Sequence, residues 1–242
     1  MKRDGASPHV MNNSLLLPAT GGEAVIALRV EVPYASFRKS YARSFAETYP
    51  LPPPATVYGM LLSLVGERFR WRHEGVRLAF AYKDKPQIAT TLRKLSRYKY
   101  GVANKQSKLG NAPDFIETLC DIEFICWIDS SHEKGQEGGY TLEERIIEAI
   151  NSPARIDRYG VLCLGLSDDA VNDVSLCDSI EGKWLRLLRS DTGAIELPVW
   201  VDHVGAAKTR WRRYELETGA KTVSTSPEEY REDQWTEMIA PQ

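Results

Sequence analysis

The stretch that most constrains this chain is a proline run followed by an apolar segment, within residues 49–67. Prolines 52–54 fix the backbone near the polyproline conformation and donate no hydrogen bonds, so the chain must arrive here extended and stiff. Thr56 then has the character of a helix N-cap, and Gly66 that of the residue just past a helix C-terminus. The apolar residues between them recur at helical spacing. We therefore expect a short, buried helix. Gly59 lies in its first turn, where glycine costs helix stability but would be tolerated if another backbone must come close.

Length and composition exclude several classes of protein. The 242 residues are 43% hydrophobic and 26% charged, as in a soluble globular chain, and no apolar run is long enough to span a membrane. Residues 1–22 are interpreted as a flexible leader, because their apolar core is too short for a signal peptide. The four cysteines lack metal-ligand spacing and lie in strand-like runs. We interpret them as reduced core residues of a cytoplasmic protein, and expect no metal and no cofactor.

Charge is distributed unevenly along the chain. The formal net charge is −2, which alone argues against binding to nucleic acid. Residues 87–108, however, contain six cations and no acidic residue, whereas the tail from Tyr214 onward is rich in acids. This separation of basic from acidic segments predicts a basic face on the protein, which the net charge of the whole chain does not reveal.

The coarse order of elements is strand, helix, strand, strand, helix, strand. Strands are expected at 23–32, where Pro33 ends the first, and at 76–82, 121–129 and 173–177; a capping box at 141–144 opens a helix to about residue 150. This order predicts an α+β fold, a ferredoxin-like (RRM-like) β-α-β-β-α-β domain over 23–180. Short strands in 181–242 are interpreted as an appended C-terminal β subdomain with an acidic tail.

Basic and aromatic residues are interleaved in the segment 93–108. Phosphates call for Arg and Lys, and unstacked bases call for aromatic faces, so this composition is typical of an RNA contact. If the segment is helical, Arg93, Arg97 and Tyr100 share a face; if it is extended, Arg97, Lys99 and Gly101 do. A solvated surface insertion is the alternative interpretation.

Three further groups of residues are candidates for binding. The cationic loop 38–43 leads to the N-terminus of the proline-braced helix, where anions are favoured, and Tyr58 either stacks on a base or packs in the core. Two arginines, 155 and 158, adjoin the glycine-containing segment 160–165, whose glycines allow close backbone approach or strand packing. A basic-aromatic knot around Trp211 contacts either RNA or an acidic neighbouring subunit; it consists of Lys208, Arg210, Trp211, Arg212 and Arg213. With the segment above, the predicted RNA-binding residues are Arg38, Lys39, Tyr41, Arg43, Thr56, Tyr58, Gly59, Arg93, Lys94, Arg97, Tyr98, Lys99, Lys105, Lys108, Arg155, Arg158, Arg210 and Arg212.

Two of these segments resemble a known family. The run Tyr49–Glu67, in which Tyr-Pro-Leu-Pro-Pro-Pro-Ala-Thr-Val-Tyr-Gly leads into an apolar helix, resembles the CRISPR-associated Cas-five family, the RAMP-type subunit of type I Cascade complexes. The run Arg-Tyr-Gly-Val-Leu-Cys-Leu-Gly-Leu-Ser at 158–167 is similar to a second motif of that family. The resemblance covers about residues 23–180. It departs from the family pattern at Val161, where a second glycine is usual, and at Ser167, near which a glutamate is expected.

The resemblance implies a function and a set of partners. A basic thumb insertion, about residues 86–112, would reach over the guide RNA near its 5′ handle. Arg158 would face that RNA, and Gly160, Leu164 and Gly165 match the same motif of the family. The chain would be a non-catalytic subunit that caps the 5′ handle of the CRISPR RNA and anchors the backbone filament and the large subunit. It would meet target DNA only through the complex.

Two alternatives remain open. One is a metal-independent endoribonuclease that processes precursor guide RNA, since one Cascade subtype uses a member of this family in that way. His73 and His203 are the histidines closest to basic neighbours, but no matched acid/base pair and no known hydrolase motif is present. The other is a subunit that only scaffolds proteins.

Overall fold

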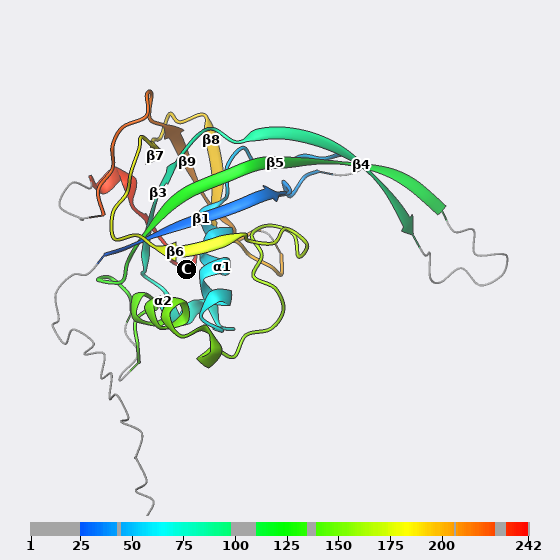
Figure 1. The fold of residues 1–242 in the computed structure, drawn as a ribbon. Helices are drawn as coiled ribbons and strands as arrows, with labels where there is room; N and C mark the ends of the chain where they lie inside the picture. Colours follow the sequence, from blue (N-terminus) through cyan, green and yellow to red (C-terminus); the bar gives the residue numbers. More distant parts are fainter. Residues whose placement is uncertain are drawn as a thin grey trace, which may run out of the picture.

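The computed structural model describes residues 25–42, 45–97, 110–134, 139–205, 207–225 and 231–241; of residues 93–97 and 110–113 it describes only the backbone. The fold is mixed α/β, with a mainly antiparallel sheet and two α-helices among the described residues, both lying below the sheet in Figure 1. The elements are β1 (Ile26–Ala35), β2 (Phe45–Ala46), α1 (Pro54–Leu64), η1 (Arg70–His73), β3 (Arg77–Tyr82), β4 (Gln87–Arg97), β5 (Gly110–Asp129), α2 (Leu142–Asn151), η2 (Pro153–Arg155), β6 (Asp173–Leu176), β7 (Leu185–Arg189), β8 (Ile195–Trp200), β9 (Arg210–Leu216), η4 (Glu232–Gln234) and β10 (Thr236–Glu237).

One sheet runs through most of the described chain. Its main path is β6-β1-β5-β3-β7-β9-β8; β10 pairs with β3, and β2 and β4 pair with β5. Each of these neighbours is antiparallel except β2, which runs parallel to β5. The strands β7 to β9 therefore continue from the β3 edge, and their apolar residues join the same core as α1.

The central strands are buried on both faces. In β3 the larger side chains Leu78, Phe80 and Tyr82 join the main core with the helices, whereas the smaller Ala79 and Ala81 face a second cluster. That second cluster is built around three tryptophans, Trp127, Trp184 and Trp235. A strand covered on both sides reads as a continuous apolar run, as the sequence of β3 does.

The N-terminus of α1 differs from the prediction. The helix begins at Pro54, and the N-cap is Pro53, with φ −65° and ψ 140° and no side-chain cap. The backbone N–H groups of Thr56 and Val57 both donate to the carbonyl of Pro53. Thr56 was therefore wrongly expected to be the cap. Proline suits the first helical position, since it has no N–H to leave unpaired and its φ is already helical.

The C-terminus of α1 confirms the prediction for Gly66. This glycine has φ +68°, and its N–H donates to the carbonyl of Ser63. The N–H of Glu67 reaches back to Leu62, which completes a Schellman motif. A Cβ at Gly66 would lie 2.4 Å from the carbonyl oxygen of Asp157, so glycine is required here on both counts.

The predicted capping box of α2 is also present. The Thr141 hydroxyl accepts from the N–H of Glu144, and the Glu144 carboxylate accepts from the N–H of Thr141. Both bonds satisfy donors that an isolated helix leaves unpaired, so the local sequence defines this terminus.

Pro33 does not end the first strand, which was a wrong expectation. The ladder between β1 and β5 pairs Val32 with Ile122 and Tyr34 with Cys120, and so passes over Pro33. The residue between the two partners, Asp121, has φ +56°. The missing proline N–H falls where the ladder is irregular, and β1 therefore continues to Ala35.

The described start of the basic segment, residues 93–97, is extended, which excludes the helical interpretation for these residues. β4 pairs with β5 along its whole length, from Gln87 opposite Cys120 to Arg97 opposite Gly110. β5 consequently starts at Gly110, eleven residues before the expected position at 121. Together the two strands form a long hairpin that projects from the body (Figure 1). Residues 98–109 lie outside the described part, as does the predicted leader.

No helix of the described residues combines the length and the apolar character needed to cross a membrane. The four cysteines are free thiols. Cys126 alone of the four is buried, so the expectation that all are core residues was wrong for the other three, which are half-buried.

Candidate nucleic-acid interface

A cavity of about 800 Å³ lies along the outer face of α1. Its walls are the segment 66–71, the loop 157–165 and the end of β8, and Gly59 lies in its lining. A Cβ at Gly59 would meet nothing within 4 Å, so no other backbone of the described residues comes close to this glycine. The glycine instead leaves open space above the middle of the helix.

Two smaller cavities flank the first. One of about 450 Å³ shares Thr56, Gly165 and Val201 with it, and one of about 440 Å³ shares Gly66, Glu67, Arg68 and Asp157 with it. The three depressions therefore lie in a row from the N-terminus of α1 past its C-terminus. We call this row the α1 trough.

Arginines and aromatic rings line the central cavity. The guanidinium of Arg68 lies over the ring of Tyr159 at 4.6 Å, and that of Arg70 lies over Trp200 at 4.8 Å. Arg70 is also anchored, because it donates to the carbonyl of Val201. Tyr159 is 74% exposed, so much of its ring meets solvent. Trp200 is buried, so the cation beside an open aromatic face is Arg68 at Tyr159, and such a pair suits a single-stranded nucleic acid.

Four of the predicted residues meet in this cavity: Thr56, Tyr58, Gly59 and Arg158. Tyr58 is 3% exposed, donates from its hydroxyl to the carbonyl of Arg70 at 2.6 Å and contacts Trp200. Burial raises the pKa of its hydroxyl. Of the two interpretations of Tyr58, the packing one fits this geometry. Arg158 is exposed at the rim.

The described part of the cationic loop, residues 38–42, lies at the N-terminal end of the trough. Arg38 lines the flanking cavity and donates to the carbonyl of Ala42. Lys39 pairs with Glu47 at 3.2 Å and lies over the ring of Tyr41, whose side chain is exposed. Burial opposes the charge of Lys39, but the bonds to Glu47 and Tyr41 outweigh it and raise its pKa. Arg43 lies outside the described residues.

The loop 157–165 is held against the end of β1. The buried carboxylate of Asp169 accepts from the N–H groups of Ser36 and Leu166, both at 2.8 Å. Gly165, with φ +114°, lies so close that a Cβ would stand 2.9 Å from the Ser36 carbonyl oxygen, whereas Gly160 faces open space. Leu164 is fully buried. Gly165 therefore allows two backbone segments of the fold to pack closely. Arg155, the other predicted residue near this loop, lines the cavity beyond the C-terminus of α1.

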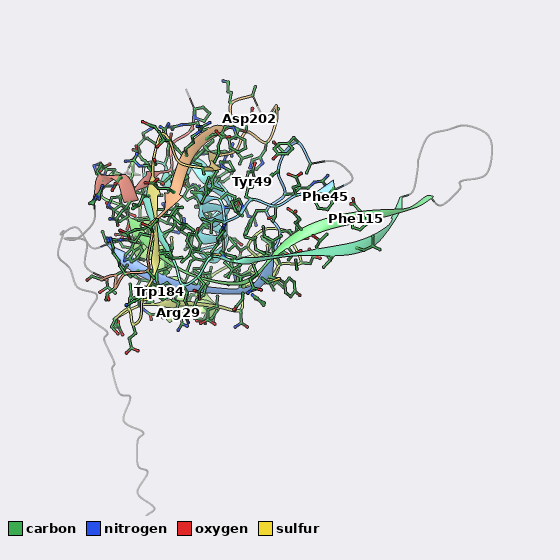
Figure 2. All side chains as sticks on the ribbon, turned by 90° about the horizontal axis from the view of Figure 1, so that it is seen from above. Arg29, Phe45, Tyr49, Phe115, Trp184 and Asp202 are labelled. Carbon is green, nitrogen blue, oxygen red and sulfur yellow. The ribbon has the colours of Figure 1, made fainter. Side chains whose placement is uncertain are left out.

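The knot around Trp211 is divided by the pleat of β9. Trp211 lines the flanking cavity and contacts the ring of Tyr49 at 6.0 Å. Arg210 and Arg212 occupy the alternate positions, and Arg210 donates to the carbonyl of Ile239. Of the described residues of this knot, Trp211 is the one that lines the trough. Tyr49 and Asp202, which also line this cavity, are labelled in Figure 2.

The cations of the hairpin are separate from the trough. Arg93, Lys94 and Arg97 lie on β4 toward the far end of the hairpin (Figure 1). Nearer the body, Phe45 of β2 and Phe115 of β5 lie side by side with their rings 6.3 Å apart (Figure 2). Tyr98, Lys99, Lys105 and Lys108 fall outside the described residues.

The two candidate histidines have different surroundings. His73 is 1% exposed and is held between Glu133 and Arg145. Arginine can only donate, so Nε2 of His73 accepts from Arg145 and Nδ1–H donates to Glu133. His203 is exposed and lines the central cavity. Within the described chain, no group of three or more His, Cys, Asp or Glu residues is placed to hold a metal ion.

A family model described as CRISPR-associated protein (Cas_Cas5) matches residues 25–173, more than half of the chain. The chain belongs to the CRISPR-associated Cas5 family. A CRISPR-associated protein Cas5 from Myxococcus xanthus (strain DK1622) is 42% identical over 196 residues, which cover 79% of this chain and 88% of the relative. The resemblance drawn from the two motifs is confirmed.

One solved structure shows a similar fold at low identity. A chain of a CRISPR RNA-guided surveillance complex superposes with a TM-score of 0.54 at 14% identity, over 87% of this chain and 95% of the other. A second structure, described as a Cas protein, has a TM-score of 0.45 at 16% identity, over 80% and 93% of the two chains.

In this Cas5-family chain, the prediction missed the residues that form the rim of the trough. They are Arg68, Arg70, Trp71 and Tyr159. The sequence contains a pattern that could have identified them. Arg-Phe-Arg-Trp-Arg at 68–72 alternates cations with aromatic rings, as does the predicted binding segment around Trp211. Tyr159 itself lies between the flagged residues Arg158 and Gly160.

Proposed function

We propose that this Cas5-family chain is the RNA-binding subunit of a CRISPR surveillance complex and that the α1 trough holds the 5′ handle of the guide RNA. The observation that carries the proposal is the trough itself, in which arginines and exposed rings gather on a chain of slightly negative net charge. The likeness to a chain of an RNA-guided surveillance complex supports the assembly.

The proposal extends to the fold. The four strands β6-β1-β5-β3, each antiparallel to its neighbour, with α1 and α2 as the two connecting helices, would form the ferredoxin-like core. The β4–β5 hairpin would be the thumb, which reaches over the guide with its cations. The backbone filament and the large subunit would be the protein partners, and target DNA would be met only through the complex.

The test is guide retention by the assembled complex. Arg68→Ala together with Arg158→Ala should weaken binding of the guide RNA and reduce the salt dependence of log K by about 0.7 for each cation that contacts a phosphate. Arg231→Ala is the matched control, because Arg231 is an exposed arginine paired with Asp233, outside the lining of the trough. Unchanged affinity and an unchanged salt slope in the double variant would remove the trough from the RNA path.

We further propose that the chain does not cut RNA. One observation favours the endoribonuclease alternative, namely the exposed His203 in the lining of the central cavity near Arg68 and Arg158. A general acid/base reaction needs two such groups converging on one phosphate, and the second candidate, His73, is buried in an ion network. Incubation of the protein with precursor guide RNA decides between the two, because only an endoribonuclease would release a discrete product.

A further inference from the structure

We infer that Arg68 and Tyr159 form a clamp on which one nucleobase of the bound RNA stacks, with its amino-bearing edge toward Asp157. The inference rests on the proposed function and specifies what the central cavity holds. Arg68 lies over the Tyr159 ring at 4.6 Å and so occupies one face of it. Tyr159 as a whole residue is 74% exposed, which leaves room on the opposite face of its ring for a second flat group.

The size and lining of the cavity suit a nucleotide. About 800 Å³ falls in the range of small-molecule sites, which are mostly apolar with a few polar groups that fix orientation. Met60, Leu62 and Val199 supply apolar lining, and Gly59 adds no side chain above the helix. Arg158 at the rim is placed to meet a phosphate. An aromatic face attracts any base by stacking, and Arg stabilises such a stack through its cation–π contact.

The acidic residues of the cavity indicate which edge of the base enters. Among the described residues that line it, the carboxylates are Glu67 and Asp157. Glu67 is occupied by Arg72 and Arg145, so it has little capacity left for a ligand. Asp157 lines both this cavity and the next, and a carboxylate repels a phosphate but accepts a hydrogen bond from the amino group of cytosine, adenine or guanine. The clamp therefore favours a base that carries an amino group.

The experiment couples one side chain to one base. Guide RNAs with a single abasic position, moved stepwise through the 5′ handle, are assembled with the full complex carrying wild-type protein or Tyr159→Ala. At one position the abasic change should weaken wild-type binding about 5- to 150-fold and leave Tyr159→Ala unaffected, as expected for the loss of one base–aromatic stack. Tyr159→Phe should behave as wild type, and Arg68→Lys should lose part of the effect because lysine has no flat group to stack.

The other outcomes are distinct. If wild-type complex retains the guide but no abasic position couples to Tyr159, the clamp is refuted and the proposed function stands. If wild-type complex does not retain the guide, both fall. If Tyr159→Ala weakens assembly with partner subunits in the absence of RNA, Tyr159 is a protein contact and the clamp is refuted. At the coupled position, a base lacking the amino group should bind less tightly to wild type and equally well to Asp157→Ala; a preference that survives in Asp157→Ala overturns the assignment of the edge.

Discussion

Arg145 of α2 donates a hydrogen bond to the carboxylate of Glu67, just past α1, over 2.7 Å. The same guanidinium donates to the carbonyl of Val65 and to His73, so one side chain joins the end of α1 to α2. Glu67 also pairs with Arg72, and its side chain is 3% exposed. Burial alone would raise the pKa of Glu67, but the hydrogen bonds from Arg145, from the N–H of Phe69 and from Arg72 lower it to about 2.

Glu67→Gln should lower the free energy of unfolding at pH 7 by about 2 kcal/mol, less than for a fully buried pair because both arginines are partly exposed. Because the pKa of Glu67 is lowered in the folded state, its carboxylate contributes its full stabilisation of the fold at pH values above the ordinary pKa of 4.5. That contribution is lost as the pH falls toward 2. The difference between wild type and variant in urea unfolding should therefore shrink from pH 5 to pH 3. The exposed Glu148→Gln is the control, and a constant difference would contradict the assigned pKa.

Gly59→Ala should stabilise the protein by about 0.5–1 kcal/mol, because glycine is unfavourable inside a helix and the added Cβ meets nothing. If RNA occupies the open space over Gly59, the same substitution should also weaken guide retention. Gly165→Ala, at φ +114° and against the Ser36 carbonyl, should lower the melting temperature instead. A stabilised Gly59→Ala protein that binds the guide normally would show that the open space over Gly59 has no part in binding.

Replacing Pro53 and Pro54 with glycine should destabilise the chain by about 1 kcal/mol per site, since glycine adds conformational entropy to the unfolded state. The free energy of guide binding should fall by more than the free energy of unfolding does, because the prolines fix the orientation of the N-terminus of α1 at the trough. Pro153→Gly, at the start of η2, controls for the loss of an ordinary proline. Equal losses of stability and binding would mean that the prolines serve folding alone.

Replacing Arg93 and Arg97 of β4, together with Lys99, by alanine should leave the melting temperature within experimental scatter while weakening guide retention. The hairpin projects from the body, so its far end contributes little to the core (Figure 1). The comparison is between thermal unfolding of the chain and the guide content of the purified complex. A large fall in stability would show that these residues belong to the folded core.

Incubation with precursor guide RNA at neutral pH, in EDTA and again in magnesium, should leave the RNA intact and shifted on a native gel. An acid and a base would each contribute about 10²- to 10⁴-fold to cleavage, and the cavity offers one exposed histidine. A discrete product at the repeat boundary that disappears in His203→Ala would overturn this prediction. His73→Ala is less informative, because His73 is buried and its loss acts through stability.

The sequence by itself determined the features whose causes lie within a few residues. The capping box at Thr141 and the Schellman glycine Gly66 satisfy backbone groups one helical turn away, so their residue types are sufficient evidence. The alternation and apolar character of β3 likewise predicted a strand. Two short motifs were enough to place the chain in its family.

Tertiary structure alone decided what depends on distant partners. β5 extends back to Gly110 because β4 supplies its hydrogen bonds, and β1 passes Pro33 because the ladder with β5 is irregular there. The trough brings Arg68, Tyr159 and Trp200 together from three separate segments. A cation–π contact or a shared cavity wall leaves no trace in local periodicity, because its energy comes from residues that meet only after the sheet and helices have packed.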